Sequence, residues 1–305
     1  LHVPGAFDKV IDIEQCEIMP RLGNMILADV RSFIKNSHLP AYDLRNHEGF
    51  WRFLMLRHSL ALDTWMVNIV SSSNNPEAVL PLADLLKEKY PSVTSIIYNI
   101  TDSVSGVSTG KEEICLHGED HIIEHLGKFK FKISANSFFQ TNTRSCENLY
   151  TKLADYAALT GNQTVMDLYS GTGTIPIWLS KKAKQVLGIE IVKSAVLNAK
   201  QNLSLNGVEN CEFLEGDIKD ILPALKQTPD LMIIDPPRVG MHKDVVGQIL
   251  RTSPERIVYV SCNPATLARD LEMLSSGYNI IEVQPVDMFP HTSHIESVAL
   301  LIARS

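Results

Sequence analysis

Apolar runs separated by turn residues fill the first part of the chain. Four of these runs are short and rich in β-forming residues, so they predict strands. They cover residues 24–34, 51–59, 64–72 and 95–101. Residues 77–90 instead carry apolar side chains at helical spacing and stop before Pro91, which predicts a helix. This part is therefore expected to be an α+β domain.

Strict alternation of strand-like and helix-like segments begins at about residue 143. Strands are predicted over residues 164–169, 185–191, 211–217, 230–237 and 256–262. Helices are predicted over residues 144–159, 175–183, 193–207, 218–227, 243–253 and 265–277. Repeated βα units favour an α/β fold with a doubly wound, Rossmann-like parallel sheet. Residues 278–289 and 296–303 are expected to close this sheet as an antiparallel hairpin.

The length of 305 residues allows one large or two ordinary domains. The change of pattern predicts a smaller α+β domain over residues 1–133 and an α/β domain over residues 134–305. Acidic residues outnumber basic ones by 35 to 28, which gives a net charge of -7. This balance argues against a protein coated in nucleic acid, although binding follows the distribution of charge rather than its sum.

Five widely spaced cysteines favour a reducing compartment, the cytoplasm, over a disulfide framework. Cys115, Cys146 and Cys211 lie in strand or helix patterns, so we expect them to be packed in the core. No apolar run reaches the length of a membrane span. The start, LHVPGAFDKV, has neither an initiator Met nor a signal-peptide pattern, and we interpret it as a start within a longer protein.

The stretch DLYSGTGTIPI, residues 167–177, follows the first strand of the second part. Gly171 and Gly173 let the backbone turn tightly and approach a ligand closely. Pro176 occupies the place where the dinucleotide-binding pattern G-x-G-x-x-G needs its third glycine. Taken alone, the loop is also compatible with a simple tight turn between a strand and a helix.

Acidic residues at three strand ends surround this loop. Glu190 ends the second strand, at an offset from the loop that suits hydrogen bonds to ribose hydroxyls. Asp167 and Asp217 lie on the same rim, where Asp217 can accept from an adenine amino group. Three carboxylates suit an adenosine that carries a cation and no phosphate, such as S-adenosylmethionine (SAM). A dinucleotide would prefer an uncluttered helix N-terminus for its pyrophosphate.

The fourth strand ends in DPPRVG, residues 235–240. Its two prolines fix the backbone and remove donors, which makes a rigid rim. Amino-directed methyltransferases carry Asn-Pro-Pro-aromatic at such a place, whereas Asp235 and Arg238 suit a different acceptor and a phosphate group. Methylation of adenine N6 is therefore disfavoured.

Cys262 follows the fifth strand in RIVYVSCNPATLARD, at the edge where open α/β sheets bind ligands. Methylation of a pyrimidine at C5 needs a nucleophile that adds to C6, because C5 is not electron-rich enough by itself. A thiolate suits this addition. A general base must then remove the C5 proton.

The candidate for this base lies in FPHTSHIESV, residues 289–298. Glu296 begins the last strand, and His291 and His294 precede it. A His-x-x-His-x-Glu pattern can also ligate zinc, but here it lacks a helical register and a companion ligand set. We therefore predict no metal site, and we expect the histidines to shape the pocket, with His294 assisting the base.

Together these residues resemble one family, the SAM-dependent RNA uracil-5-methyltransferases that modify ribosomal and transfer RNA. FFQTN, DLYSGTG, GIEI, DPPR, VSCNPATLARDL and FPHTSHIE look like successive signatures of that family. The resemblance covers nearly the whole chain. It implies a class I, seven-stranded SAM-dependent methyltransferase domain that follows a smaller RNA-contacting α+β domain. The wording SCNPATLARDL looks more like the ribosomal RNA branch.

The resemblance also implies a role for each matching residue. Cys262 would be the nucleophile and Glu296 the general base. Residues that would contact SAM are Gln140, Tyr169, Gly171, Thr174, Glu190, Asp217 and Asp235. Gln140 and Arg238 would contact the substrate.

Two features of the family have no full counterpart in the sequence. Many members have an N-terminal OB-like RNA-binding domain called TRAM, and many bind a 4Fe-4S cluster through four cysteines. Cys16 resembles the last of those cysteines, but the other three are missing, so we expect no complete cluster in this chain. RNA contacts are expected at two basic runs with aromatic residues, 128–132 and 50–58.

The sequence thus predicts an RNA uridine-C5 methyltransferase that forms a covalent Cys–C6 adduct, acts on 23S ribosomal RNA, and needs no membrane or obligate protein partner. A transfer RNA uridine-54 methyltransferase is the alternative within the class. A non-catalytic RNA-binding assembly factor with a SAM fold is an alternative from another class, and the intact set of Cys262, Glu296 and Gln140 argues against it. The incomplete glycine motif disfavours a hydride-transferring Rossmann enzyme.

Overall fold

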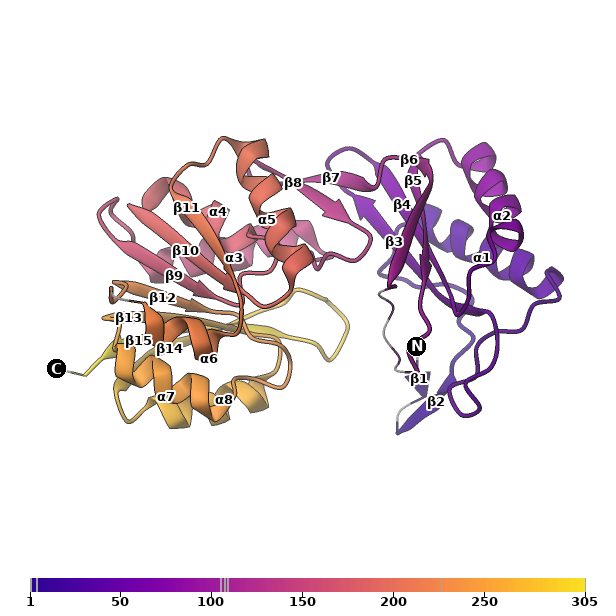
Figure 1. Ribbon diagram of the computed structural model, residues 1–305. Coiled ribbons are helices and arrows are strands. Elements are labelled where there is room, and N and C mark those ends of the chain that lie inside the picture. Colours follow the sequence, from indigo (N-terminus) through magenta and orange to yellow (C-terminus); the bar gives the residue numbers. More distant parts are fainter. Residues whose placement is uncertain are drawn as a thin grey trace. The chain divides into compact units, whose positions relative to one another are not determined.

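The computed structural model describes residues 2–3, 5–104, 106, 108, 110–225 and 227–304. The chain forms two compact units, each with its own sheets (Figure 1). The first unit extends to Ile123 and also contains Ser134–Asn136. The second contains Glu124–Ile133 and the described chain from Ser137 onward.

A four-stranded sheet in the order β3-β4-β5-β6 forms the centre of the first unit. β4 and β5 are parallel, and each outer strand is antiparallel to its neighbour. Two helices, α1 and α2, cover one face through a core that includes Ile26, Trp65 and Leu82. The element bounds are β1 His2–Val3, β2 Ala6–Val10, α1 Arg21–Asn36, β3 Trp51–Ser59, β4 Thr64–Ser71, α2 Pro76–Lys89, β5 Val93–Ile100 and β6 Glu112–Gly118.

The strand predicted over residues 24–34 is wrong, because this segment lies within helix α1. Ile26 and Val30 are buried against the sheet, and Leu22, Phe33 and Ile34 pack beside them. These positions recur every three or four residues, which is the period of a helix that covers an apolar surface. The helical period therefore outweighs the β propensity of the individual residues.

A hairpin of β7 (His121–Leu126) and β8 (Phe129–Ser134) lies where the chain passes from the first unit to the second. The division differs from the predicted boundary after residue 133, because Glu124–Ile133 belongs to the second unit. Phe129 and Phe131 are buried there, beside Trp178 and Phe139 respectively. Their outward neighbours are lysines, so apolar and basic side chains alternate along β8 as a strand requires.

A seven-stranded sheet in the order β11-β10-β9-β12-β13-β15-β14 forms the second unit. Helices α3, α4 and α5 pack on one face and α6, α7 and α8 on the other (Figure 1). The strands are β9 Thr164–Leu168, β10 Gln185–Glu190, β11 Cys211–Glu215, β12 Leu231–Ile234, β13 Arg256–Ser261, β14 Tyr278–Val286 and β15 Glu296–Ala303. The helices are α3 Thr143–Ala157, α4 Thr174–Leu179, α5 Lys193–Asn206, α6 Ile218–Ile221, α7 Lys243–Thr252 and α8 Pro264–Leu274.

Two of the predicted helices are shorter than expected. α4 ends at Leu179 and a 3₁₀ turn follows at Ser180–Lys182, within the predicted range 175–183. α6 has a single turn and continues as the 3₁₀ turn Leu222–Ala224. Pro223 explains the second case, since a proline inside a helix cannot donate to the preceding turn.

The strand directions bring the carboxyl end of β13 and the amino end of β15 to the same edge of the sheet. β9, β10, β11, β12 and β13 are parallel, so their carboxyl ends share an edge of the sheet. β15 is antiparallel to β13, with Ser297 paired to Ser261. The amino end of β15 therefore lies at the same edge, which is where an open α/β sheet binds its ligands.

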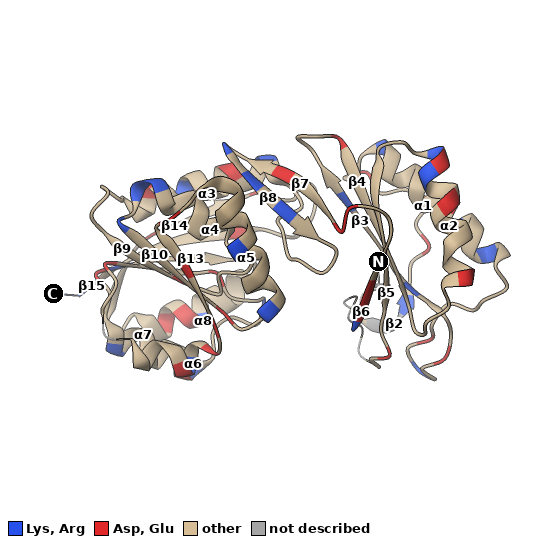
Figure 2. Cartoon of the chain, turned by 45° about the horizontal axis from the view of Figure 1, so that its top comes forward, with Lys and Arg blue, Asp and Glu red and all other residues tan. Residues whose placement is uncertain are grey.

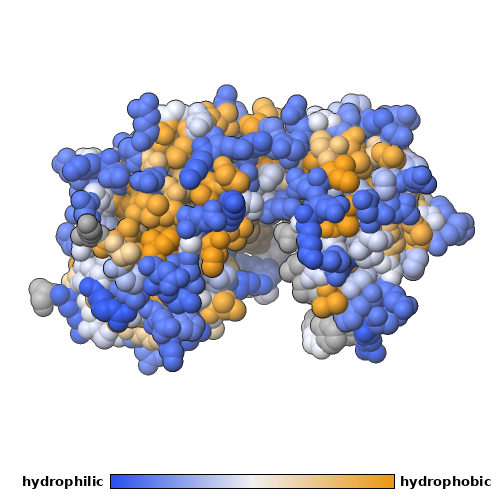
Figure 3. All heavy atoms as spheres, in the orientation of Figure 1, coloured by the Kyte–Doolittle hydropathy of each residue, from blue (hydrophilic) through white to orange (hydrophobic). Residues whose placement is uncertain are grey.

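Within the described residues, no helix is both long and apolar enough to cross a membrane. The face shown in Figure 3 carries hydrophilic side chains interspersed with smaller apolar areas.

Candidate active site

A tight loop follows β9 and leads into α4. Tyr169, Gly171 and Gly173 all have a positive φ, of 75°, 53° and 82° respectively. A Cβ at Gly173 would lie 2.6 Å from Cζ of Phe213, so both the backbone turn and the packing require glycine there. Tyr169 adopts a conformation that is rare for a side chain of its size, and such conformations gather at ligand sites.

Glu190 at the end of β10 is held against this loop. Its Oε2 accepts a hydrogen bond from the amide of Gly171 at 2.9 Å, and its Oε1 accepts from the amide of Val192 at 2.8 Å. A carboxylate has about four acceptor sites, so the side chain retains capacity for ribose hydroxyls. The predicted ribose contact is thus geometrically available.

Asp217 follows β11 and caps helix α6. Its Oδ1 accepts from the amide of Lys219 at 2.9 Å, and its Oδ2 lies 3.1 Å from the Lys219 ammonium. Hydrogen bonding to the Lys219 amide lowers the pKa of Asp217. The residue therefore has a structural role as a helix cap, in addition to the adenine contact predicted for it.

Thr174 is the first residue of α4, and Gln140 lies in the segment that precedes α3. The Thr174 hydroxyl is 2.7 Å from the buried Tyr150 hydroxyl of α3. Gln140 belongs to a segment that is anchored twice: the Phe138 carbonyl accepts from Thr172 Oγ1 at 3.3 Å, and Asn142 Nδ2 donates to the Met288 carbonyl at 2.9 Å. These anchors connect the Gln140 segment both to the glycine loop and to the chain that precedes Glu296.

Two further carboxyl groups belong to neighbouring strands of this sheet: Asp167 in β9 is buried, and Asp235, directly after β12, is half-buried. Asp167 is 1% exposed, and neither of its carboxyl oxygens has a hydrogen-bond partner. Burial raises its pKa well above the usual value, with further contributions from Asp235 and Glu190. Burial also raises the pKa of Asp235 to about 7, and the charge of Glu296 adds to that shift. An orphaned buried carboxyl group calls for a partner, and a bound cation or amine would supply one.

Cys262 and Glu296 are brought together by the pairing of β13 with β15. Ser261 pairs with Ser297 in this antiparallel register, so the next positions outward are Cys262 and Glu296. Glu296 is 7% exposed, and burial raises its pKa to about 7. Burial also raises the pKa of the Cys262 thiol, and the Glu296 carboxylate raises it further. The Glu296 carboxylate thus acts electrostatically on the candidate nucleophile.

The Arg238 guanidinium contributes a positive charge to this site. It lowers the pKa of Cys262 and of Glu296, which opposes the effect of burial on both groups. One guanidinium nitrogen lies 2.9 Å from Nδ1 of His294. This contact occupies Nδ1 of His294, so that nitrogen is not free to ligate a metal ion.

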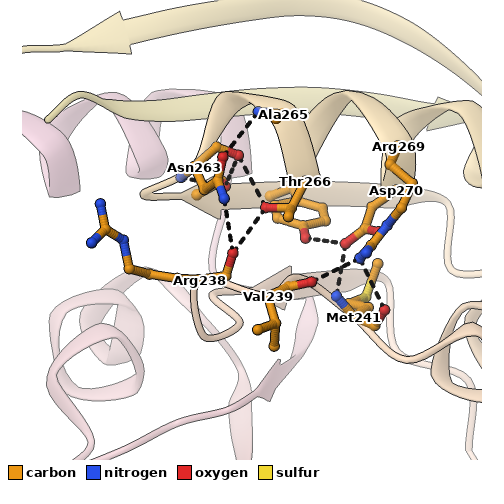
Figure 4. Close-up of polar contacts among 10 residues, drawn as sticks. Arg238, Val239, Met241, Asn263, Ala265, Thr266, Arg269 and Asp270 are labelled. Atoms are coloured by element: carbon orange, nitrogen blue, oxygen red, sulfur yellow. Dashed lines mark hydrogen bonds and ion pairs between the residues drawn. The ribbon is translucent and has the colours of Figure 1, made fainter. Parts of the chain in front are cut away.

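Sequence reasoning missed two features of this edge. Phe138 is 72% exposed beside Gln140, and an exposed ring is suited to stack on an unpaired base. Arg269 and Asp270 of α8 hold the turn that carries Arg238 (Figure 4). Gly240 of the DPPRVG stretch could have indicated these contacts, since a glycine allows another chain segment to approach closely.

The remaining cysteines lie in different surroundings. Cys146 is buried, and burial raises its pKa to about 12. Cys211 is partly buried, and the same cause raises its pKa to about 12. The expectation of core packing is wrong for Cys115, which is exposed on β6. Its neighbours Ile114 and Leu116 pack under the sheet, so the strand alternation turns Cys115 away from the core.

The second unit has the strand order of a class I methyltransferase, in which the antiparallel strand β15 lies between β13 and β14 and the other six strands run in one direction. The sequence profile described as tRNA (uracil-5-)-methyltransferase matches residues 99–304. The chain belongs to this family.

Individual relatives agree with that assignment. A protein of Bacteroides thetaiotaomicron named as an uncharacterized RNA methyltransferase is 41% identical over 309 residues, which cover 99% of this chain and 68% of the relative. A protein of Chlorobaculum tepidum with the same description is 42% identical over 306 residues, covering 98% of this chain and 63% of its own length. The chain thus spans about two thirds of these relatives.

A solved structure is similar over nearly all of the chain. It is the Pyrococcus abyssi tRNA (uracil-54, C5)-methyltransferase in complex with S-adenosyl-L-homocysteine. The TM-score is 0.78 at 34% identity, over 97% of this chain and 71% of that one.

Proposed function

We propose that this protein transfers a methyl group from SAM to C5 of a uridine in RNA, with Cys262 as nucleophile and Glu296 as general base. The observation that supports this proposal is the antiparallel pairing of Ser261 with Ser297, because the next positions in this register, at the ligand-binding edge of the sheet, are Cys262 and Glu296. A cysteine beside a buried carboxyl group is the pair that addition to C6 and proton removal from C5 require.

The residues of the edge fit SAM as the methyl donor. When bound, SAM supplies a methyl group on a positively charged sulfur. The two buried carboxyl oxygens of Asp167 have no hydrogen-bond partner, and polar groups of a bound cofactor could supply one, which supports this choice. Glu190 would bind the ribose and Asp217 the adenine. The loop next to the cofactor would contribute further contacts, from Tyr169, Gly171 and Thr174.

The reaction can be followed through the electrons of the uracil ring. The Cys262 thiolate forms a bond to C6, and the electrons of the C5–C6 double bond move toward the C4 carbonyl. C5 is then nucleophilic and forms a bond to the methyl carbon, while the bond from that carbon to the sulfonium sulfur of SAM breaks and its electron pair stays on the sulfur. Glu296 removes the C5 proton, the C5–C6 double bond forms again, and the C6–S bond breaks to release the thiolate. Because both faces of the ring are used, the uridine must leave its stack.

A methyl-transfer assay tests this function. Labelled SAM is incubated with the protein and with separated ribosomal and transfer RNA, and the RNA is digested to nucleosides. We expect label in 5-methyluridine. Label in another nucleoside, or no transfer to either RNA, would contradict the proposal.

The RNA target has two candidates. The SCNPATLARDL stretch resembles the ribosomal RNA branch, so we propose 23S ribosomal RNA. Transfer RNA is the second candidate, because the family profile and the Pyrococcus abyssi relative both carry transfer RNA in their names. Mass mapping of modified uridines in both RNA classes, from cells that lack the gene, separates the two.

Loss of the Glu190 carboxylate should weaken SAM binding. Glu190→Ala removes the acceptors proposed for the ribose hydroxyls, and a hydrogen bond to a charged group contributes about 1.5–3 kcal/mol. We therefore expect the Kd for SAM, measured by calorimetry, to rise roughly tenfold or more. Glu212→Ala, an exposed acid on the neighbouring β11, is the control and should bind SAM as the wild type does. Equal affinities for all three proteins would exclude the ribose contact.

The hairpin β7–β8 offers a basic surface for RNA. The ammonium groups of Lys128 and Lys181 lie 5.8 and 5.4 Å from the centre of the Phe129 ring. Contact with Lys181 lowers the pKa of Lys128, so two positive charges lie close together on an exposed surface. Lys130 is exposed on β8, and Figure 2 shows basic positions, in blue, along this strand. Phosphate groups would relieve this crowding.

The basic run at residues 50–58 is less suited to RNA. Arg57 donates to the Ala135 carbonyl at 3.1 Å, and Arg52 donates to the Thr101 carbonyl at 3.2 Å. His58 stacks on Trp65 with 4.4 Å between ring centres. These side chains are therefore used within the first unit.

Neutralising the lysine surface should weaken RNA binding and its salt dependence. For the double variant Lys128→Gln, Lys181→Gln, we expect the slope of log K against log salt to fall by about 0.7 for each lost contact to single-stranded RNA. Filter binding with the RNA fraction that accepts methyl groups measures this slope. The control is Lys87→Gln, Lys89→Gln, which removes the same charge from α2, where the lysines pair with Asp84 and Asp29. Equal slopes for both variants would show that the hairpin does not contact RNA.

A further inference from the structure

The turn at residues 237–241 is held by the buried Asp270 of helix α8. Asp270 is fully buried, and its Oδ2 accepts from the Met241 amide at 2.7 Å and from the Tyr259 hydroxyl at 2.6 Å (Figure 4). Its Oδ1 accepts two hydrogen bonds from Arg269, at 2.8 and 2.7 Å. The carboxylate is thus fully satisfied, which a buried charge requires.

Arg269 reaches from the same helix to the backbone of the turn. Its guanidinium donates to the Val239 carbonyl at 3.0 Å and to the Met241 carbonyl at 3.2 Å. The turn itself closes with a hydrogen bond from the Gly240 amide to the Pro237 carbonyl at 2.8 Å. A Cβ at Gly240 would lie 2.4 Å from the Arg269 guanidinium and 2.7 Å from Asp270. The chain approaches α8 so closely that only glycine fits.

The residue carried by this turn is Arg238. Its carbonyl accepts from Asn263 Nδ2 at 3.1 Å and from Thr266 Oγ1 at 3.3 Å. Its backbone is thereby bonded to α8 on one side, and the Arg269–Asp270 pair fixes the following peptides. The guanidinium remains directed toward His294 in the chain that leads to Glu296.

We propose that Arg269 and Asp270 are positioning residues that hold the Arg238 guanidinium beside Cys262 and Glu296. This inference rests on the proposed function, in which Cys262 must act as a thiolate. Three charged groups act on the thiol: Glu296 of β15 and Asp235 at the end of β12 disfavour the thiolate, and Arg238 favours it. Arg238 is the one group among these three that promotes ionisation, and its carbonyl is bonded to Asn263, the residue that follows Cys262, so a shift of Arg238 would act on the thiol.

The pH dependence of Cys262 alkylation tests this inference without RNA or SAM. Iodoacetamide reacts with the thiolate, and mass spectrometry of the Cys262 peptide reports the rate at each pH. In Arg269→Gln we expect the alkylation curve to move to higher pH by roughly one unit, because the favourable cation is no longer held in place. Arg269→Lys retains a cation beside Asp270 but loses one carbonyl contact, and it should shift the curve by less.

A double variant tests whether Arg269 acts on Cys262 through Arg238. If Arg269 acts through Arg238, then Arg269→Gln should add no further shift in an Arg238→Gln protein. Arg251→Gln, an exposed cation on α7, is the control and should alkylate as the wild type does. An unshifted curve for Arg269→Gln, or an equal shift in the presence and absence of Arg238, overturns the inference.

The same experiment separates this inference from the proposed function. Alkylation of Cys262 is measured on the protein alone, so its outcome does not depend on methyl transfer. Absence of methyl transfer to any RNA by the wild type would contradict the proposed function. The alkylation curves would still support or overturn the role of Arg269, because they are measured without RNA or SAM.

Discussion

Replacing Cys262 with alanine should lower methyl transfer to RNA by roughly a thousandfold or more, because C5 of uracil is a weak nucleophile until a group has added to C6. Alanine lacks this group but keeps a small side chain at the end of β13. Single-turnover transfer from labelled SAM is the measurement. SAM affinity, measured by calorimetry, should stay within about twofold of the wild type, since the residues proposed to hold SAM are unchanged.

Cys115→Ala is the matched control for this result. Cys115 is exposed on β6 of the first unit, so its loss should affect neither transfer nor SAM binding. Wild-type activity in Cys262→Ala would refute the covalent mechanism. Equal loss of activity in both variants would point to a general defect rather than to a missing nucleophile.

Replacing Glu296 with glutamine should stop the reaction after methyl transfer. The amide cannot accept the C5 proton, so the C6–S bond cannot break and the protein stays attached to methylated RNA. We expect turnover to fall by roughly 10²- to 10⁴-fold, and a protein–RNA band to persist on a denaturing gel. In the wild type, the rate should rise as the pH increases through about 7, because burial raises the pKa of this base to about 7.

Two controls define what the trapped band means. Glu255→Gln, an exposed acid next to the start of β13, should turn over normally and leave no band. The double variant Cys262→Ala, Glu296→Gln should also leave no band, because it lacks the sulfur. Normal turnover by Glu296→Gln would show that another group removes the proton.

The sequence predicted the second unit well because each βα unit is a local pattern. Strand ends such as Glu190 and Cys262 follow apolar runs directly, and a parallel sheet then places them at one edge. The first unit was harder to predict. Residues 24–34 contain enough β-forming residues to resemble a strand, and only packing against the sheet shows that α1 buries one helical face.

The candidate site was predicted as a set of residues and not as a geometry. The pairing of Ser261 with Ser297 joins segments that are distant in the sequence, so no local pattern could reveal that Cys262 and Glu296 are neighbours. Asp167 appeared to be a carboxylate of the rim, but its position inside β9 buries both oxygens. Arg269 and Asp270 looked like ordinary helix residues, because their contacts with the Arg238 turn are tertiary.

Mass spectrometry of a protein–RNA adduct provides the decisive measurement. RNA that contains 5-fluorouridine in place of uridine has no C5 proton, so Glu296 cannot complete the reaction and the adduct should accumulate. After digestion, we predict a peptide that contains Cys262 joined to a nucleotide bearing both fluorine and a new methyl group. A nucleotide attached to any other residue, or methylated RNA without an adduct, would contradict the mechanism.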